Sequence, residues 1–139
     1  MKRAGHLLIL SVIITCTSCT TGGTPTPDIH TYDNNDFTTP VVEIYTPSDN
    51  QVFASGDTIK VDGKVTDNSL YRGSVRITDD ATGSVIKEQL YEIHGFTSYN
   101  FHIEYKTAVS AISNYTVSVQ FEDHGANNGF KSAKIKVNP

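Results

Sequence analysis

The feature that most constrains this chain is an alternation of apolar and polar residues with a period of two, which recurs over its last hundred residues. The clearest run is 59–66, where Ile, Val, Gly and Val are separated by Lys, Asp, Lys and Thr. Successive side chains of a β-strand point to opposite faces of a sheet, so this run predicts a strand with one buried and one solvated face. The pattern returns at 99–105, 115–121 and 133–137. It predicts an all-β domain.

Shorter strand segments and turn signals complete the pattern. We expect further strands at 41–45, 51–54, 75–77 and 85–94, turns at 47–50 and 79–83, and a hairpin turn at Asn128-Gly129. The segment 107–113 has a weak helical signal. About seven short strands in a hundred residues are typical of an immunoglobulin-like antiparallel β-sandwich. Tyr115, at the start of the penultimate strand, occupies the place of a tyrosine corner in that fold.

Three segments carry a resemblance to known modules: 40–47, 56–61 and 63–67. They resemble the opening of disulfide-free bacterial Ig-like, cadherin-like and fibronectin-like domains. Similar arrangements occur in small lipoproteins of Bacteroidota whose domains are of unknown function. The chain has no Trp and lacks the cysteine pair of antibody domains. The resemblance implies the fold, and it leaves the activity open because one fold serves many functions.

The first eighteen residues have the layout of a secretory signal peptide. Lys2 and Arg3 precede an apolar run at 7–14, and small residues follow up to Ser18. The apolar run is shorter than the roughly 20 residues that a membrane-spanning helix needs. The segment also resembles the signal of bacterial lipoproteins, in which a small residue precedes an invariant Cys.

That resemblance implies that residues 1–18 are removed and that Cys19 is lipidated by a diacylglycerol carrying fatty-acyl chains such as palmitate. Cys16 is the alternative acceptor, but Thr15 before it fits the small-residue rule poorly. The chain has only these two cysteines, so the mature domain would have no disulfide. We therefore expect a membrane partner through the N-terminal lipid. We also expect a place in the cell envelope, as an outer-membrane lipoprotein facing the periplasm or the surface.

The segment 19–39 is built largely from Thr, Gly, Pro, Asp and Asn. It lacks a hydrophobic period, which predicts a flexible tether after the lipidated Cys19. The remaining residues, 40–139, are enough for one hydrophobic core and too few for two. They are the predicted Ig-like domain.

Charge and motifs narrow the function. Loss of Lys2 and Arg3 with the signal leaves nine Lys and Arg against fifteen Asp and Glu, and this acidic balance argues against a nucleic-acid partner. The sequence has no nucleophile elbow, phosphate-binding glycine loop or zinc-protease helix. We therefore predict that the protein is not an enzyme, but a binding or structural module that contacts a protein or a glycan.

Two groups of residues suggest a metal site as the alternative function. If strand alternation continues from one strand to the next, Glu92, His94, His102 and Glu104 share one hairpin face. Imidazoles and carboxylates within 5 to 8 Å, roughly the spacing of cross-strand neighbours, could hold Zn²⁺ or Cu²⁺. The simpler interpretation is an ordinary solvated face.

The second group follows from the expected topology. In such a sandwich the inter-strand loops gather at one end, which brings Asp67, Asp123 and His124 together with Asn68 and His94. Oxygen ligands at that end could bind Ca²⁺. The simpler interpretation is that Asp67 and Asp123 cap turns by accepting hydrogen bonds from nearby backbone amides.

Overall fold

The computed structural model describes residues 33–139. The predicted signal peptide, Cys19 and most of the predicted tether lie outside the described residues. Within 33–139 no helix has the length and apolar character needed to cross a bilayer. The strands are β1 (Val41–Thr46), β2 (Gln51–Ala54), β3 (Thr58–Thr66), β4 (Leu70–Asp79), β5 (Val85–Glu92), β6 (Ser98–Lys106), β7 (Ser113–Asp123) and β8 (Asn128–Asn138).

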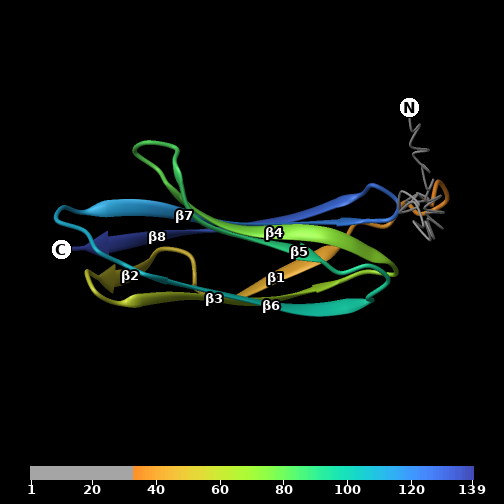
Figure 1. Cartoon of the computed structure of the whole chain (residues 1–139), viewed down its shortest axis with the longest axis horizontal. Helices are drawn as coiled ribbons and strands as arrows, with labels where there is room; N and C mark the ends of the chain where they lie inside the picture. Colours follow the sequence, from red (N-terminus) through yellow and green to blue (C-terminus); the bar gives the residue numbers. More distant parts are fainter. Residues whose placement is uncertain (1–32) are drawn as a thin grey trace, which may run out of the picture.

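The strands form two sheets packed face to face (Figure 1). One sheet has three strands in the order β1-β3-β6, and the other has five in the order β2-β8-β7-β4-β5. All pairs are antiparallel except β2 with β8. The chain passes from the first sheet to the second just after β1, at the cis peptide bond Thr46-Pro47. This topology is an immunoglobulin-like sandwich, and residues 33–139 contain no cysteine and so no disulfide, which confirms the predicted fold class.

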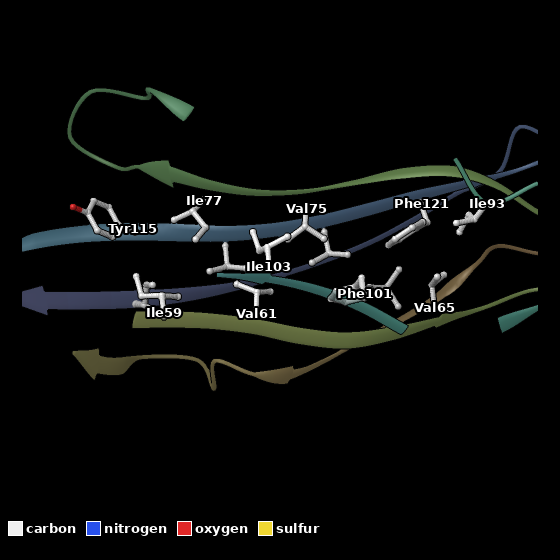
Figure 2. Packing of buried hydrophobic residues seen from close by; sticks show 14 of the residues in the cluster. Ile59, Val61, Val65, Val75, Ile77, Ile93, Phe101, Ile103, Tyr115 and Phe121 are labelled. Atoms are coloured by element: carbon white, nitrogen blue, oxygen red, sulfur yellow. The ribbon is translucent and has the colours of Figure 1, made fainter. Parts of the chain in front are cut away.

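The core lies between the two sheets and is built from the apolar residues of the alternating runs (Figure 2). Burial of apolar side chains stabilises such a core by roughly 25 cal/mol per Å² removed from water. Tyr115 is buried here as well. The largest fully buried apolar side chains are Phe101, Phe121, Ile59, Leu70, Ile77, Val61, Val65, Val75, Val117, Val119 and Val137.

Three local predictions are wrong. Strands β5 and β6 belong to different sheets, so they do not form a hairpin. The turn between β7 and β8 lies at 124–127, where Ala126 has a φ of 63°, and not at Asn128-Gly129. Asn128 instead pairs with Glu122 inside the ladder. The segment 107–112 is irregular rather than helical.

The last residues of the predicted tether, 33–39, contact the domain instead of extending freely from it. The Asp33 amide donates to the His124 carbonyl at 2.8 Å, and the Asn127 side chain donates to the Asp36 carbonyl at 3.1 Å. Gly125 lies so close to Asp36 that a Cβ there would meet the Asp36 carbonyl oxygen at 2.7 Å. Figure 1 shows this segment beside the β7–β8 loop, at the end of the sandwich opposite the C-terminus. The domain therefore begins before Pro40.

Candidate ligand groove and metal sites

The outer face of the five-stranded sheet carries rows of side chains that cross four strands. In one row the strand register aligns Leu90 of β5, Ser74 of β4, Gln120 of β7 and Phe130 of β8. Leu90 is 63 % exposed and Phe130 is 62 % exposed. Neighbouring strands lie about 4.8 Å apart, so the two apolar side chains flank a polar floor about 14 Å wide.

A hollow of about 290 Å³ lies on this face. Ser74 has the smallest outward-facing side chain around it, which lowers the surface over β4. The wall combines apolar surface with polar groups, and the Gln120 amide donates a hydrogen bond to Asn128 Oδ1 at 2.9 Å. The lining residues are Arg72, Gly73, Ser74, Leu90, Tyr91, Glu92, Gln120, Glu122 and Asn128. We call this hollow, together with Phe130 beside Gln120, the outer-face groove.

The arginines on this face are neutralised by neighbouring carboxylates. Arg72 Nε lies 2.8 Å from Glu122 Oε2, and its guanidinium carbon lies 4.9 Å from the centre of the Tyr71 ring. Arg76 pairs with Glu88 one row further along. The groove therefore offers hydrogen-bonding groups and apolar surface without a strong net field.

Three carboxylates converge at the end of the sandwich where the chain enters. One oxygen each of Asp36, Asp67 and Asp123 lies within 4.8 Å of the other two. Asp67 follows β3, Asp123 ends β7, and Asp36 is held against them by the contacts of residues 33–39. The predicted meeting of Asp67 and Asp123 thus occurs in the structure, with Asp36 as a third member that the sequence did not indicate. We call these residues the acidic cluster.

Each of these carboxylates also caps a turn, as the simpler interpretation expected. Asp67 accepts from the Ser69 amide at 3.0 Å, and Asp36 accepts from the Thr38 amide at 2.9 Å. Asp123 is fully buried, and its two oxygens accept from the backbone and side-chain nitrogens of Asn127 at 2.8 and 2.9 Å.

The pKa values of Asp67 and Asp36 depart from their ordinary values in opposite directions. Partial burial raises the pKa of Asp67, and the charges of Asp123 and Asp36 raise it further, against the lowering effect of the Ser69 amide. Hydrogen bonds from Thr38 lower the pKa of Asp36. A cation between the three carboxylates would relieve the repulsion that Asp67 experiences.

The predicted group Glu92, His94, His102 and Glu104 does not assemble on one hairpin face. Glu92 ends β5 in the five-stranded sheet and His94 follows it, whereas His102 and Glu104 lie on β6 in the three-stranded sheet. The cause is the crossing of the chain between sheets after β5, which sequence alternation does not reveal. The four residues form two separate pairs.

One pair lies on the outer face of the three-stranded sheet. His102 Nδ1 is hydrogen-bonded to Asp62, its register partner on β3, and His102 Nε2 lies 3.5 Å from Glu104. The hydrogen bond to Asp62 is the main cause that raises the pKa of His102. The His102 side chain is exposed, and Lys60 Nζ lies 3.4 Å from Glu104 Oε1.

The other pair lies at the same end as the acidic cluster. His94 Nε2 lies 3.2 Å from Glu92 Oε2, and the His94 ring packs near the His124 ring and the buried Tyr71 ring. Sequence reasoning expected His94 and His124 at this end. It also expected Glu92 near His94, but it missed Tyr71 and Asp36 at this end of the sandwich.

Sequence reasoning also missed the outer-face groove. The signal was present: Leu90 and Phe130 occupy positions where alternation places polar residues. Without the register across β5, β4, β7 and β8, nothing in the sequence joined these two residues into one row.

Residues 33–139 thus form an immunoglobulin-like β-sandwich. No family model matches the chain, and no curated protein matches it.

Among solved structures, an engineered protein has 18 % identity over 72 % of this chain, with a TM-score of 0.51. The fibronectin(III)-like modules of Clostridium thermocellum CbhA have 21 % identity over 72 % of the chain, with a TM-score of 0.46. The superoxide reductase of Ignicoccus hospitalis has 12 % identity over 73 % of the chain, with a TM-score of 0.47, and the chain covers 81 % of it. The chain spans 20 % of the engineered protein and 47 % of the matched chain of CbhA fibronectin(III)-like modules. Such likeness reflects a shared fold and leaves function to the sites.

Proposed function

We propose that this protein is a lipid-anchored module of the cell envelope that binds a neutral glycan in the outer-face groove. The observation that carries the proposal is the row Leu90–Ser74–Gln120–Phe130, in which two exposed apolar side chains flank a polar floor. The module is not catalytic in this proposal.

The chemistry of the groove favours a sugar. Sugar rings present apolar C–H faces and a rim of hydroxyl groups, so they need both an apolar surface and hydrogen-bond partners. Phe130 and Leu90 supply the apolar surface, and the amides of Gln120 and Asn128 supply the hydrogen-bond partners. Because Arg72 is paired with Glu122, the groove gives no strong preference for an anionic ligand. A floor about 14 Å wide has room for a short oligosaccharide.

The anchor belongs to the same proposal. The signal-like segment 1–18 and the Ser18-Cys19 pair support lipidation at Cys19, and two or more acyl chains give stable membrane attachment. Radiolabelled palmitate should be incorporated into the intact chain in cells and into Cys16→Ala. It should be absent from Cys19→Ala, and equal labelling of the Cys19→Ala variant would remove the anchor from the proposal.

The binding proposal is tested on the chain from residue 20 onward, which lacks both cysteines. A panel of neutral oligosaccharides identifies a ligand, and calorimetry then compares Leu90→Ala with Phe130→Ala. We expect each variant to lose about tenfold in affinity, which corresponds to ~1.4 kcal/mol. The matched control is Ile112→Ala, because Ile112 is also exposed but lies outside the groove.

Two outcomes would count against the glycan. In the first, no oligosaccharide of the panel binds, but the native chain captures an envelope protein. If Leu90→Ala and Phe130→Ala both abolish that capture, the groove is a protein-binding surface. The other is glycan binding that Ile112→Ala weakens as much as Phe130→Ala does, which would place the ligand elsewhere.

Binding of Ca²⁺ at the acidic cluster is a second candidate function. The observation that favours it is the approach of Asp36, Asp67 and Asp123 oxygens to within 4.8 Å of one another, since Ca²⁺ is held by several oxygen ligands. Calorimetric titration with Ca²⁺ should give binding that Asp67→Asn weakens and Glu88→Gln leaves unchanged. Equal affinity of the native chain and Asp67→Asn would refute this function.

A further inference from the structure

His94 and His124 come from different connections of the chain and meet at the end of the sandwich. His94 lies in the β5–β6 connection and His124 in the β7–β8 connection. Their ring centres are 5.5 Å apart. The ring of Tyr71, which is buried, lies 4.6 Å from the His94 ring and 5.1 Å from the His124 ring. Tyr71 therefore packs against both imidazoles.

This spacing matches two imidazoles that share one metal ion. A Zn–N bond of about 2.0 to 2.1 Å places the ion roughly 3.2 Å from each ring centre. At a tetrahedral angle the two ring centres are then about 5.2 Å apart, and at wider angles about 5.5 Å. The observed 5.5 Å lies in that range.

Hydrogen-bond partners orient the His124 ring, as they do for histidines that bind a metal through their other ring nitrogen. Its Nδ1 lies 3.3 Å from the Ser69 carbonyl oxygen and 3.1 Å from the Ser69 hydroxyl. A carbonyl oxygen only accepts, so this contact favours the proton on Nδ1 and the lone pair on Nε2. Hydrogen bonding of one ring nitrogen to a carbonyl, with metal on the other, is the common arrangement at metal sites.

His94 has a carboxylate beside it. Glu92 Oε2 lies 3.2 Å from His94 Nε2, and a carboxylate next to a ligand imidazole raises its basicity and fixes its orientation. We propose that His94 and His124 form a site for a divalent ion of borderline softness, Zn²⁺ or Cu²⁺, with Glu92 as the orienting carboxylate and water in the remaining positions.

The site is chemically distinct from the acidic cluster nearby. Imidazole nitrogens suit Zn²⁺ and Cu²⁺, whereas carboxylate oxygens alone suit Ca²⁺ and Mg²⁺. It also differs from the four-residue face expected from the sequence, because His102 lies on the other sheet and takes no part.

The test is calorimetric titration of Zn²⁺ into the chain from residue 20 onward, where no thiol competes for the metal. We expect one site, an affinity that falls at least 100-fold in the double variant His94→Asn with His124→Asn, and a loss of about tenfold in Glu92→Gln. The matched controls are His102→Asn and His30→Asn, which should bind as the native chain does. Circular dichroism establishes that each variant is folded.

A second readout does not depend on affinity. Electron paramagnetic resonance of the Cu²⁺ form should show coupling to two imidazole nitrogens in the native chain and to one in either single variant. Zinc affinity that survives in the double variant, or that falls equally in His102→Asn, would overturn the proposal. So would a copper spectrum that is the same in His124→Asn as in the native chain.

Discussion

The ring of Phe101 on β6 stacks on the ring of Phe121 on β7, with centres 5.7 Å apart and planes inclined by 28°, and this contact joins the two sheets within the core. Each ring lies over a glycine on the neighbouring strand. Gly63 is the register partner of Phe101, and Gly73 is the register partner of Phe121. A Cβ at either glycine would collide with the facing phenyl ring.

Gly73→Ala should therefore destabilise the domain. The added methyl group forces the Phe121 ring out of its place, and such overpacking typically costs about 1–3 kcal/mol. In a domain of this size, that corresponds to a fall in Tm of roughly 4–8 °C per kcal/mol. Thermal unfolding should show this fall for Gly73→Ala and almost none for Ser74→Ala, the adjacent residue on the outer face. Equal melting temperatures for Gly73→Ala and the native chain would contradict this packing.

Thr107 is a buried polar residue that ties the β2–β3 turn to the end of β6. Its hydroxyl oxygen lies 2.9 Å from the Ala54 carbonyl and accepts from the Gly56 amide at 3.0 Å. Thr107→Val keeps the shape but removes the hydrogen bonds of the hydroxyl, so we expect a loss of about 0.5–1.5 kcal/mol in chemical denaturation. Thr58→Val, at an exposed position of β3, is the control. The prediction fails if both substitutions have the same small effect.

Much of the fold follows from the sequence, and the reasons are specific. Val61 and Val65 are buried on β3 because a strand exposes alternate side chains to opposite faces, and that period is visible in the sequence. The separation of His94 from His102 was not predictable in this way. It depends on which sheet each strand joins, and period two is the same in both sheets.

The candidate sites likewise contain features that the sequence predicts and features that it does not. Asp67 and Asp123 were predicted to meet because loop positions follow from the sandwich topology. Asp36 was not, because its position depends on hydrogen bonds of residues 33–39 to the β7–β8 loop. The groove required the register that aligns Leu90 with Phe130.

The Asp62–His102 pair should give a pH-dependent contribution to stability. The hydrogen bond to Asp62 raises the folded-state pKa of His102 above its ordinary value of 6.5. The stabilisation is therefore fully present below pH 6.5 and is lost as the pH rises through the raised folded pKa. By NMR, the His102 ring should titrate at a higher pH in the native chain than in Asp62→Asn, and Glu88→Gln should leave it unchanged. A His102 midpoint that does not move in Asp62→Asn would contradict this assignment.

The charge of Asp67 should destabilise the domain, whereas the Asp62–His102 pair stabilises it. Burial and the neighbouring carboxylates raise its folded-state pKa above 3.8, so its charged form opposes folding at neutral pH. This destabilisation disappears as the pH falls below 3.8, where the residue is protonated in both states. Asp67→Asn should melt above the native chain at pH 7 without Ca²⁺ and level with it at pH 3.

If the acidic cluster binds Ca²⁺, the ion reverses the order of the melting temperatures of the native chain and Asp67→Asn at pH 7. Added Ca²⁺ should raise the melting temperature of the native chain at pH 7 and have little effect on Asp67→Asn, because a ligand that binds only the folded state stabilises it. An equal response of both proteins to Ca²⁺ would indicate that the ion binds outside the acidic cluster.

The central claim is that the outer face of the five-stranded sheet is the ligand surface, and amide NMR tests it most directly. The chain from residue 20 onward is titrated with the oligosaccharide that the panel identifies, and shifts are mapped by residue. We predict that the large shifts fall on Ser74, Leu90, Gln120 and Phe130. The largest shifts on the outer face of the three-stranded sheet, around Asp62 and His102, would contradict the claim.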